Sequence, residues 1–333
     1  MTKKIFIILG LISSIAAAQV LMPTPESAFE SQHPFNPWVI KTTGIRRICF
    51  EIIDKKDFEV AVDKSLTEMY EFNDSGQLSR HYFTNVARTL EKQVTIVDRR
   101  RRKYTRVISD FVYDTVSTTY FYSGNQLILK RYHDGASYYE SRYYRYDSTG
   151  NLTKELRFKE TNTSVNPSVF MLGNQVLLSV DSFQYQRYSS GQVKCTLLNS
   201  ENRPYKEMII NYDSLGRKKD ISETYVAAAW IRQHYSYEYA GDHLVKSRFE
   251  GNANNPVTLL NSYVYDQKNE LYEEKQYRNE ILIKEISYVA DRATGMLNSF
   301  VIRDPINRTM RIVKLRYDYG SLGNCNLPVN TGN

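Results

Sequence analysis

Along most of the chain, apolar and polar residues alternate with a period of two rather than with the 3.6-residue period of a helix. β-branched and aromatic residues occupy the apolar positions of these stretches. Pairs of aromatic residues two positions apart, such as Tyr144 and Tyr146, place both rings on one face of a strand. This pattern predicts a protein that is almost entirely β-structured.

A short unit recurs along the chain, in which two aromatic or apolar residues, two positions apart, are usually followed by Asp, Gly and Leu, with Asn269 at the glycine position of one copy. Copies of it cover residues 70–78, 144–152, 210–217, 237–244 and 263–271. From Gly191 onward the turn residue recurs at positions 216, 241, 269, 295 and 320, with spacings of 25, 25, 28, 26 and 25 residues. So regular a period indicates a repeat architecture.

Each unit has the chemistry of a β-hairpin turn. The aspartate carboxylate accepts hydrogen bonds from backbone N–H groups just ahead of it. The glycine then adopts a positive φ that other residues resist, and the turn closes as a common hairpin loop. The predicted turn residues are Asp74, Gly76, Asp147, Gly150, Asp213, Gly216, Gly241, Asp266 and Gly295.

The repeat length sets the expected fold. A period near 25 residues leaves room for two strands and two turns, and polar segments such as 199–202 and 304–307 supply the second turn. We expect an all-β fold, an antiparallel up-and-down meander of hairpin repeats that forms a long, curved, open or partly closed β-sheet. No segment within residues 44–322 resembles an interdomain linker, so these residues are predicted to form a single domain.

The two ends of the chain have a different composition. Lys3 and Lys4 precede an apolar stretch at 5–15 and three alanines, which is typical of a secretory signal peptide cleaved after Ala18. The apolar stretch is shorter than the roughly 20 residues that span a bilayer, although an N-terminal anchor is the alternative. The sequence predicts a signal peptide (1–18), an extended proline-rich leader (19–43) and a flexible tail (323–333).

The predicted signal peptide indicates an exported bacterial protein, located in the periplasm, on the outer surface or in the medium. We expect no transmembrane segment after signal cleavage. The formal net charge of +7 falls to +5 when the two lysines of the signal are removed. So modest a charge does not predict a nucleic-acid partner. The basic run at 99–103 is interpreted as a solvated turn, with phosphate or sulfated-glycan binding as the alternative.

Three cysteines, Cys49, Cys195 and Cys325, follow the signal. Their spacing fits no metal-binding pattern, and an odd number permits at most one bridge within the chain. A clasp between Cys49 and Cys325, which flank the repeats, and three separate thiols both remain open.

The unit Tyr-x-Tyr-Asp-x-x-Gly-x-Leu, clearest at 144–152 and 212–217, resembles the tyrosine–aspartate (YD) repeats of bacterial Rhs-type proteins and teneurins. In that family the repeats pair side by side into a long β-sheet that spirals into a shell. The resemblance covers about residues 60–322, but the period is longer and no toxin or self-cleaving segment is evident. It implies the hairpin architecture and a role in surface interactions, and nothing catalytic.

The chain contains no recognisable catalytic motif. Gly-x-Ser-x-Gly, His-Glu-x-x-His, the phosphate-binding loop and Cys-x-x-Cys are all absent. His133 and His243 lie beside aspartates, but in predicted turns where polar residues are expected. Each turn aspartate lacks the alternating ligands of a calcium loop. We therefore expect no enzyme activity, no catalytic residue, no metal site and no cofactor.

The high tyrosine count, 27 in all, raises the question of ligand binding. Tyrosine offers a large contact area and a hydrogen-bonding tip, but the repeat rings also suit a stacked core. The neighbouring pairs at 138–139 and 143–144 place rings on both faces of the sheet, so the predicted ligand-contact residues are Tyr138, Tyr139, Tyr143 and Tyr144.

The sequence thus favours a non-catalytic envelope or secreted protein that acts as a binding scaffold for an unidentified envelope protein or glycan. A carbohydrate-binding module that uses exposed tyrosine rows is the main alternative. An outer-membrane barrel and an enzyme are further alternatives. Charged residues such as Lys275 and Arg278, next to Tyr277, argue against a lipid-facing wall.

Overall fold

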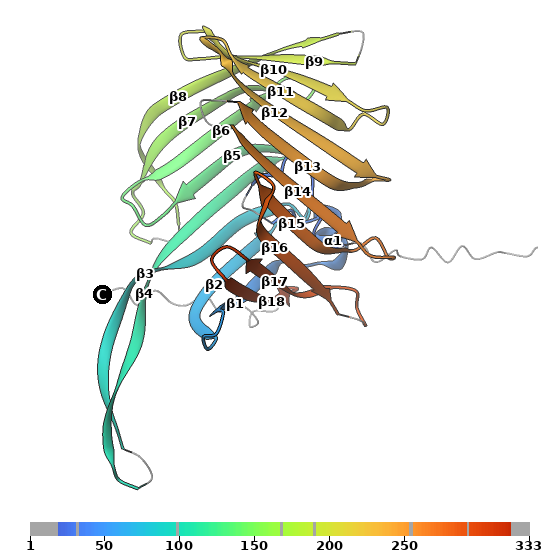
Figure 1. The fold of residues 1–333 in the computed structure, drawn as a ribbon. Coiled ribbons are helices and arrows are strands. Elements are labelled where there is room, and N and C mark those ends of the chain that lie inside the picture. Colours follow the sequence, from blue (N-terminus) through green and yellow to red (C-terminus); the bar gives the residue numbers. More distant parts are fainter. Residues whose placement is uncertain are drawn as a thin grey trace, which may run out of the picture.

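The structure is a computed structural model that describes residues 19–30, 33–97, 100–166, 169–188, 191–252, 256–291 and 293–320. The predicted signal peptide, the tail at 323–333 and Cys325 lie outside the described residues. Within them the chain forms one short helix, α1 (Pro37–Thr43), and eighteen strands that belong to a single sheet (Figure 1).

The strands are β1 (Arg47–Lys56), β2 (Val62–Phe72), β3 (Leu78–Val97), β4 (Lys103–Ser123), β5 (Gln126–His133), β6 (Tyr139–Tyr146), β7 (Leu152–Asn162), β8 (Leu172–Arg187), β9 (Val193–Leu198), β10 (Pro204–Tyr212), β11 (Lys218–Tyr225), β12 (Ala228–Ala240), β13 (His243–Asn252), β14 (Val257–Tyr265), β15 (Leu271–Arg278), β16 (Ile281–Ala290), β17 (Leu297–Asp304) and β18 (Thr309–Asp318).

Each strand pairs in antiparallel fashion with the next one along the chain, which confirms the predicted meander. β1 also pairs with β18, from Arg47 opposite Asp318 to Lys56 opposite Thr309, and Figure 1 shows these two strands next to each other. The sheet therefore closes into an 18-stranded barrel, and the prediction of an open or partly closed sheet was wrong. Local turn chemistry specifies each hairpin, whereas closure depends on two strands at opposite ends of the chain.

The repeat turns all lie at one end of the barrel, here called the repeat-turn rim, because the strands alternate in direction. Residues 191, 216, 241, 269, 295 and 320 all have positive φ values. At the turn after β6, the Asp147 carboxylate accepts hydrogen bonds from the backbone N–H groups of Thr149 and Asn151, both at 2.9 Å. Asp213 and Asp266 accept equivalent pairs of bonds at their turns.

Asp74 does not have the role predicted for it. The side chain that accepts the turn bonds is that of Asn73, from the N–H groups of Ser75 and Gln77, both at 3.0 Å. Asn73 stands three residues before Gly76, as Asp147 stands before Gly150, so the turn begins one residue earlier than predicted. The exposed Asp74 pairs instead with Arg46.

The second tyrosine of the unit has a structural role that sequence reasoning did not identify. Its hydroxyl donates to a backbone carbonyl on the adjacent strand of the preceding hairpin. This bond joins Tyr146 to Leu127 at 2.9 Å, Tyr239 to Lys218 at 2.8 Å and Tyr265 to Leu244 at 2.9 Å. The repeated Tyr-x-Tyr therefore fixes one hairpin to the next as well as filling the interior.

The predicted extended leader is folded, and it lies inside the barrel. Leu21 pairs with Phe35, and Asn36 caps α1 by accepting a hydrogen bond from the backbone N–H of Trp38. We call the described residues 19–30 and 33–44 the plug segment. It contacts opposite walls of the barrel. The side-chain amide of Asn261 on β14 donates to the Ala28 carbonyl. Glu26 pairs with Lys218 on β11, and the Phe35 ring packs against Tyr70 on β2.

Gly76 shows how closely the plug segment approaches the wall. A Cβ added at this residue would lie 2.0 Å from the carbonyl oxygen of Pro37, and the φ of Gly76 is +78°. Only glycine satisfies both the turn and the approach of α1. The plug segment is therefore docked against the repeat-turn rim at the end of β2.

The core lies between the plug segment and the inner face of the barrel. Its largest cluster joins Leu21 and Ile40 of the plug to Phe50, Tyr70 and Phe300 on β1, β2 and β17. A second cluster joins Ala28 to repeat residues of β12–β15, namely Tyr237, Leu244, Tyr263 and Leu271. Many repeat rings are thus core residues, and the plug supplies the apolar surface against which they pack.

The outer face of the same strands is charged. Tyr263 on β14 lies opposite Glu274 on the inner face, so the flanking Glu273 and Lys275 point outward. Lys275 pairs with Glu273 at 2.8 Å and with Glu285 of β16 at 3.6 Å, while Lys246 of β13 pairs with Glu238 of β12 at 3.2 Å. The wall is aromatic inside and ionic outside over this half of the barrel.

β3 and β4 are longer than the other strands, at 20 and 21 residues, and remain paired as far as Val97 and Lys103. Figure 1 shows their outer parts projecting as a separate hairpin beyond the barrel. The described part of the basic run, residues 100–103, is exposed at its tip.

Candidate functional site

The plug segment leaves a cavity of about 580 Å³ between itself and strands β2 to β6. This volume is within the range of small-ligand sites. The wall contributes three repeat tyrosines and one lysine, which are Tyr120, Tyr122, Tyr144 and Lys130. The plug contributes Glu30, His33 and Phe35 to the opposite side. We call this space the lumen cavity.

The three tyrosines come from the inner positions of adjoining hairpins. Tyr120 and Tyr122 belong to the unit that ends β4, and Tyr144 belongs to the unit that ends β6. Burial raises the pKa of Tyr122 to about 12, with a further contribution from Tyr120. Burial likewise raises the pKa of Tyr144 to about 12, with Glu155 adding to the effect. These phenols stay neutral at physiological pH and keep their hydrogen-bonding hydroxyls.

Charged groups complement the rings. The Lys130 ammonium lies 5.7 Å from the centre of the Tyr120 ring, which is within the range of a cation–π contact. Glu30 of the plug is close enough to influence the ionisation of Tyr144. Asn125 adds an amide group at the repeat-turn rim, whereas the amide of Gln77 is already bonded to Asn73 and to the Gly124 carbonyl. Flat rings with an amide, a lysine and a carboxylate around them suit a polar ligand that carries both hydroxyls and apolar faces.

The structure separates the four tyrosines predicted to contact ligand. Tyr144 lines the lumen cavity. The Tyr138 ring lies 3.8 Å from the Lys159 ammonium and outside that cavity's lining. Tyr139 stacks on His133 with ring centres 4.1 Å apart, and Tyr143 lies on the outer face of β6. The four residues therefore do not form one site.

Tyr143 belongs to a hydrogen-bonded network around Glu160, a side chain with 0% exposure. One carboxylate oxygen accepts from Ser141 at 2.5 Å and Arg131 at 3.1 Å. The other oxygen accepts from Tyr143 at 2.6 Å and from Gln175 at 2.7 Å. Both oxygens are fully used, so this network has a structural role.

Phe170 covers that network from the loop between β7 and β8. Its ring centre lies 3.6 Å from the Arg131 guanidinium and 4.9 Å from the Tyr139 ring. The rings of Tyr139 and Tyr143 therefore make their contacts with other side chains of this protein, namely His133, Phe170 and Glu160.

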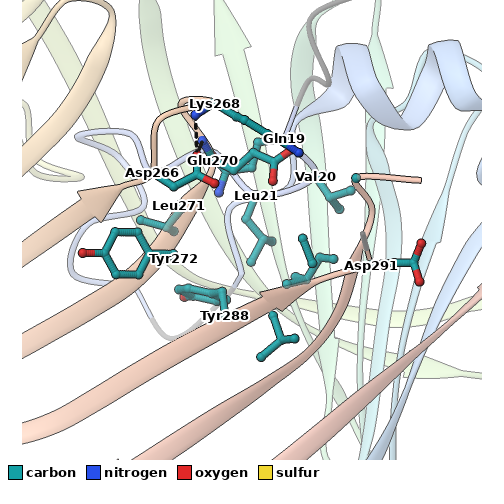
Figure 2. Close-up of a pocket in the computed structure, with 14 residues that line it drawn as sticks. Gln19, Val20, Leu21, Asp266, Lys268, Glu270, Leu271, Tyr272, Tyr288 and Asp291 are labelled. Atoms are coloured by element: carbon teal, nitrogen blue, oxygen red, sulfur yellow. Dashed lines mark hydrogen bonds between the residues drawn. The ribbon is translucent and has the colours of Figure 1, made fainter. Parts of the chain in front are cut away.

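A smaller pocket of about 330 Å³ lies at the repeat-turn rim beside β15 and β16 (Figure 2). Gln19, at the beginning of the plug segment, lines it together with Asp266, Glu270, Tyr288 and Asp291. A third hollow, of about 600 Å³, is at the opposite rim. There Asp54 is paired with Arg311 at 2.7 Å and Lys64 at 3.2 Å, so its central charges are already satisfied.

The described residues bring no three His, Cys, Asp or Glu side chains together in a group suited to a metal ion. Cys195 is a buried free thiol, whereas Cys49 is disulfide-bonded. His33 and His81 lie in the interior, where His81 stacks on Tyr70 and its ring nitrogen lies 2.9 Å from Glu68.

Sequence reasoning missed Glu30, Lys130, Tyr120 and Tyr122 as lining residues. The unit at 120–127 is recognisable in the sequence, and it signals an inward-facing pair of rings. No sequence signal places Glu30 opposite them, because that position depends on the path of the plug segment. No helix of the described chain combines the length and apolar composition needed to cross a membrane.

Comparison with protein-family models yields no match, and no curated protein matches the chain. Among solved structures, it is similar to a porin-like protein from Bacteroides uniformis, with 10% identity, 82% of this chain and 98% of that chain covered, and a TM-score of 0.33. A porin-like protein from Bacteroides vulgatus gives 8% identity, 82% and 98% coverage, and a TM-score of 0.27.

A third similarity is to the Tc holotoxin pore of Photorhabdus luminescens, with 10% identity and a TM-score of 0.26. It covers 85% of this chain but only 20% of that one. Identities and TM-scores this low carry no argument about function, and the resemblance to YD repeats stays a prediction. The closed barrel itself agrees better with the outer-membrane alternative than with an open scaffold, so the question becomes what surrounds the barrel.

Proposed function

We propose that this chain is an exported, non-catalytic binding protein whose barrel stands in water and whose lumen cavity takes a sugar-like ligand. The observation that supports this proposal is the wall of the cavity, where Tyr120, Tyr122 and Tyr144 from two hairpins face the plug segment. Rings of this kind bind the apolar faces of sugars, while Lys130, Glu30 and the Asn125 amide suit the hydroxyls.

The polarity of the two faces supports an aqueous surrounding. Transmembrane barrels turn apolar residues outward and polar residues inward. Here the inner face carries Tyr237 and Tyr263, and the outer face of the same strands carries Lys246 and Lys275 in ion pairs. A lysine or arginine near the bilayer midplane costs about 2–4 kcal/mol, and a wall with several of them would be strongly disfavoured in lipid.

The direct test is binding by the mature protein, residues 19–333, in isothermal titration calorimetry. The probes are hexoses, N-acetylhexosamines, uronic acids and their disaccharides. We expect at least one class to bind and Tyr144→Ala to weaken binding about tenfold, which corresponds to about 1.4 kcal/mol. Tyr104→Ala is the matched control, because Tyr104 is exposed on the projecting hairpin, far from the cavity.

Two results would contradict the proposal. One is the absence of binding to every sugar class. The other is equal loss with Tyr104→Ala and Tyr144→Ala, which would mean that the cavity is not the site. Capture of an envelope protein that is unaffected by either substitution would support the interaction scaffold instead.

The second candidate is an outer-membrane barrel, which the closed sheet favours. Leu177 of β8, which lies opposite Phe158 on the outer face of β7, is about half exposed and would suit a lipid contact on that side. Flotation with liposomes separates the two candidates. Co-flotation of the purified protein without detergent would support the membrane barrel, and recovery in the aqueous fraction would support the proposed one.

A further inference from the structure

The rim pocket beside β15 and β16 contains a carboxylate with an unsatisfied oxygen. Glu270 is 9% exposed, and its Oε1 atom is buried without a hydrogen-bond partner. An unpaired polar atom in such a place costs about 1–3 kcal/mol, and more when the group is charged. The side chain lines the pocket shown in Figure 2.

The groups around Glu270 do not neutralise the charge of its carboxylate. Burial raises the pKa of Glu270, Asp266 raises it further, and Lys268 only partly opposes them. One oxygen of Asp266 is already used by the backbone N–H groups of Lys268 and Glu270, at 2.8 and 2.9 Å. The pocket therefore has an excess of negative charge and lacks a buried cation.

The beginning of the plug segment is held at this pocket. Val20 and Leu21 are buried, and the Val20 carbonyl accepts a hydrogen bond from the N–H of Asn36 at 2.8 Å. Gln19, the residue before them, lines the pocket together with Glu270. Figure 2 shows Gln19 at the same end of the pocket as the Glu270 side chain.

The sequence predicts cleavage after Ala18, which would turn the Gln19 backbone nitrogen from a neutral amide into a positively charged α-ammonium. We propose that this α-ammonium, created by removal of the signal peptide, pairs with the buried Glu270 carboxylate and fastens the plug segment to the rim. The cation is then supplied by processing, and the docked plug is complete only in the cleaved chain. This inference is independent of what the lumen cavity binds.

The pairing has a chemical consequence for Gln19. An N-terminal glutamine cyclises when its unprotonated amine attacks the side-chain amide carbonyl, forming a C–N bond and releasing ammonia. An ammonium held by Glu270 keeps its proton and has no free electron pair for this attack. The folded protein should therefore retain an open, charged Gln19.

The experiment uses the full mature chain, with its first residue established by mass spectrometry after export. Three variants are compared with it. Glu270→Gln removes the anion, an extra glycine before Gln19 moves the ammonium by one residue, and the third combines both changes. Glu280→Gln is the control, because Glu280 is exposed in the turn of the same β15–β16 hairpin.

We expect Glu270→Gln and the added glycine each to lower the Tm by about 3–8 °C, and the combination to lower it no further than either alone. Loss of ammonia from Gln19, followed by mass over days at pH 8, should be at least about fivefold faster in Glu270→Gln. Glu280→Gln should change neither quantity.

Three results would overturn the pairing. The mature chain could begin at a residue other than Gln19. The two single changes could add in the double variant, or Glu270→Gln could leave both the Tm and the cyclisation rate unchanged. Since the cyclisation rate reports on the amine itself, a variant that is merely less stable would not imitate the expected pattern.

Discussion

Two sides of the barrel lumen use the same repeat residue differently. On β12 and β14 the first tyrosine of the unit, Tyr237 or Tyr263, is buried beneath the plug segment. On β6 the equivalent Tyr144 is half-buried and lines the lumen cavity. The unit has the same chemistry at both places, and what differs is whether the plug segment covers it. A repeat tyrosine thus becomes core or binding surface according to a segment far away in the chain.

The largest effect should come from removing a ring on the filled side. Phe300 is buried against Phe50 and His33, with ring centres 5.4 and 5.1 Å away. We expect Phe300→Ala to lower the free energy of unfolding by about 3–5 kcal/mol, because it leaves a cavity in the core. Urea unfolding measures this, with the outer-face Phe121→Ala as a control expected to cost under about 1 kcal/mol. Equal losses would mean that the plug side is no better packed than the surface.

The plug also predicts a dependence on pH. Burial lowers the pKa of His33 to about 4, while Glu68 opposes this change and Lys284 and His81 add to it. The unfolded chain, with a histidine pKa near 6.5, binds the proton more readily than the folded chain. The stability contributed by neutral His33 is therefore fully present above pH 6.5 and is lost as the pH falls toward 4. The expected loss is about 3 kcal/mol.

Urea unfolding at pH 7 and pH 5 in the wild type and His33→Phe isolates this contribution. The variant should lose the part of the pH dependence that belongs to His33 and to its interaction with Glu68, while carboxylates that do not interact with His33 contribute equally to both proteins. An unchanged pH dependence in His33→Phe would show that the plug histidine is accessible to water.

A matched pair of substitutions sharpens the comparison between the two sides. Tyr263→Ala removes a covered ring and Tyr144→Ala an uncovered one from the same repeat position. The first should cost at least about 2 kcal/mol more than the second, since a cavity forms only where the surroundings cannot relax into water. Thermal unfolding of both variants tests this, and the reverse order would contradict the assignment of the filled side.

The smallest effect concerns the second tyrosine. Tyr265→Phe removes the hydrogen bond to the Leu244 carbonyl, and Tyr146→Phe removes the one to the Leu127 carbonyl. Each should cost about 0.5–1.5 kcal/mol, as for a typical hydrogen bond. Similar costs on the two sides, measured by urea unfolding, would show that this bond belongs to the repeat and not to the plug. A cost on one side alone would contradict that reading.

The sequence predicted what is local. Residues such as Asp147, Gly216 and Asn269 define their own turns through side-chain acceptors and positive φ values, and the period of two places the rings on one face. The shift from Asp74 to Asn73 shows the limit even there, because both residue types accept turn hydrogen bonds. The lumen cavity depends on Glu30 lying near β6, and closure depends on the pairing of β1 with β18. Both involve residues far apart in the chain, so no local sequence pattern predicts them.

Closure of the barrel has a consequence for the order of folding. The residues paired between β1 and β18 are about 250–270 positions apart in the chain, so this ladder has the highest loop-closure cost in the sheet. Neighbouring strands can pair as local hairpins early in folding, but the free edge of β1 has no lasting partner until β18 is in place. Lys314 and Arg316 on β18, and Glu51 on β1, place charges along these late edges. Such charges discourage pairing with strands of other chains. The β1 and β18 edges are therefore disfavoured as aggregation sites during the time before they pair with each other.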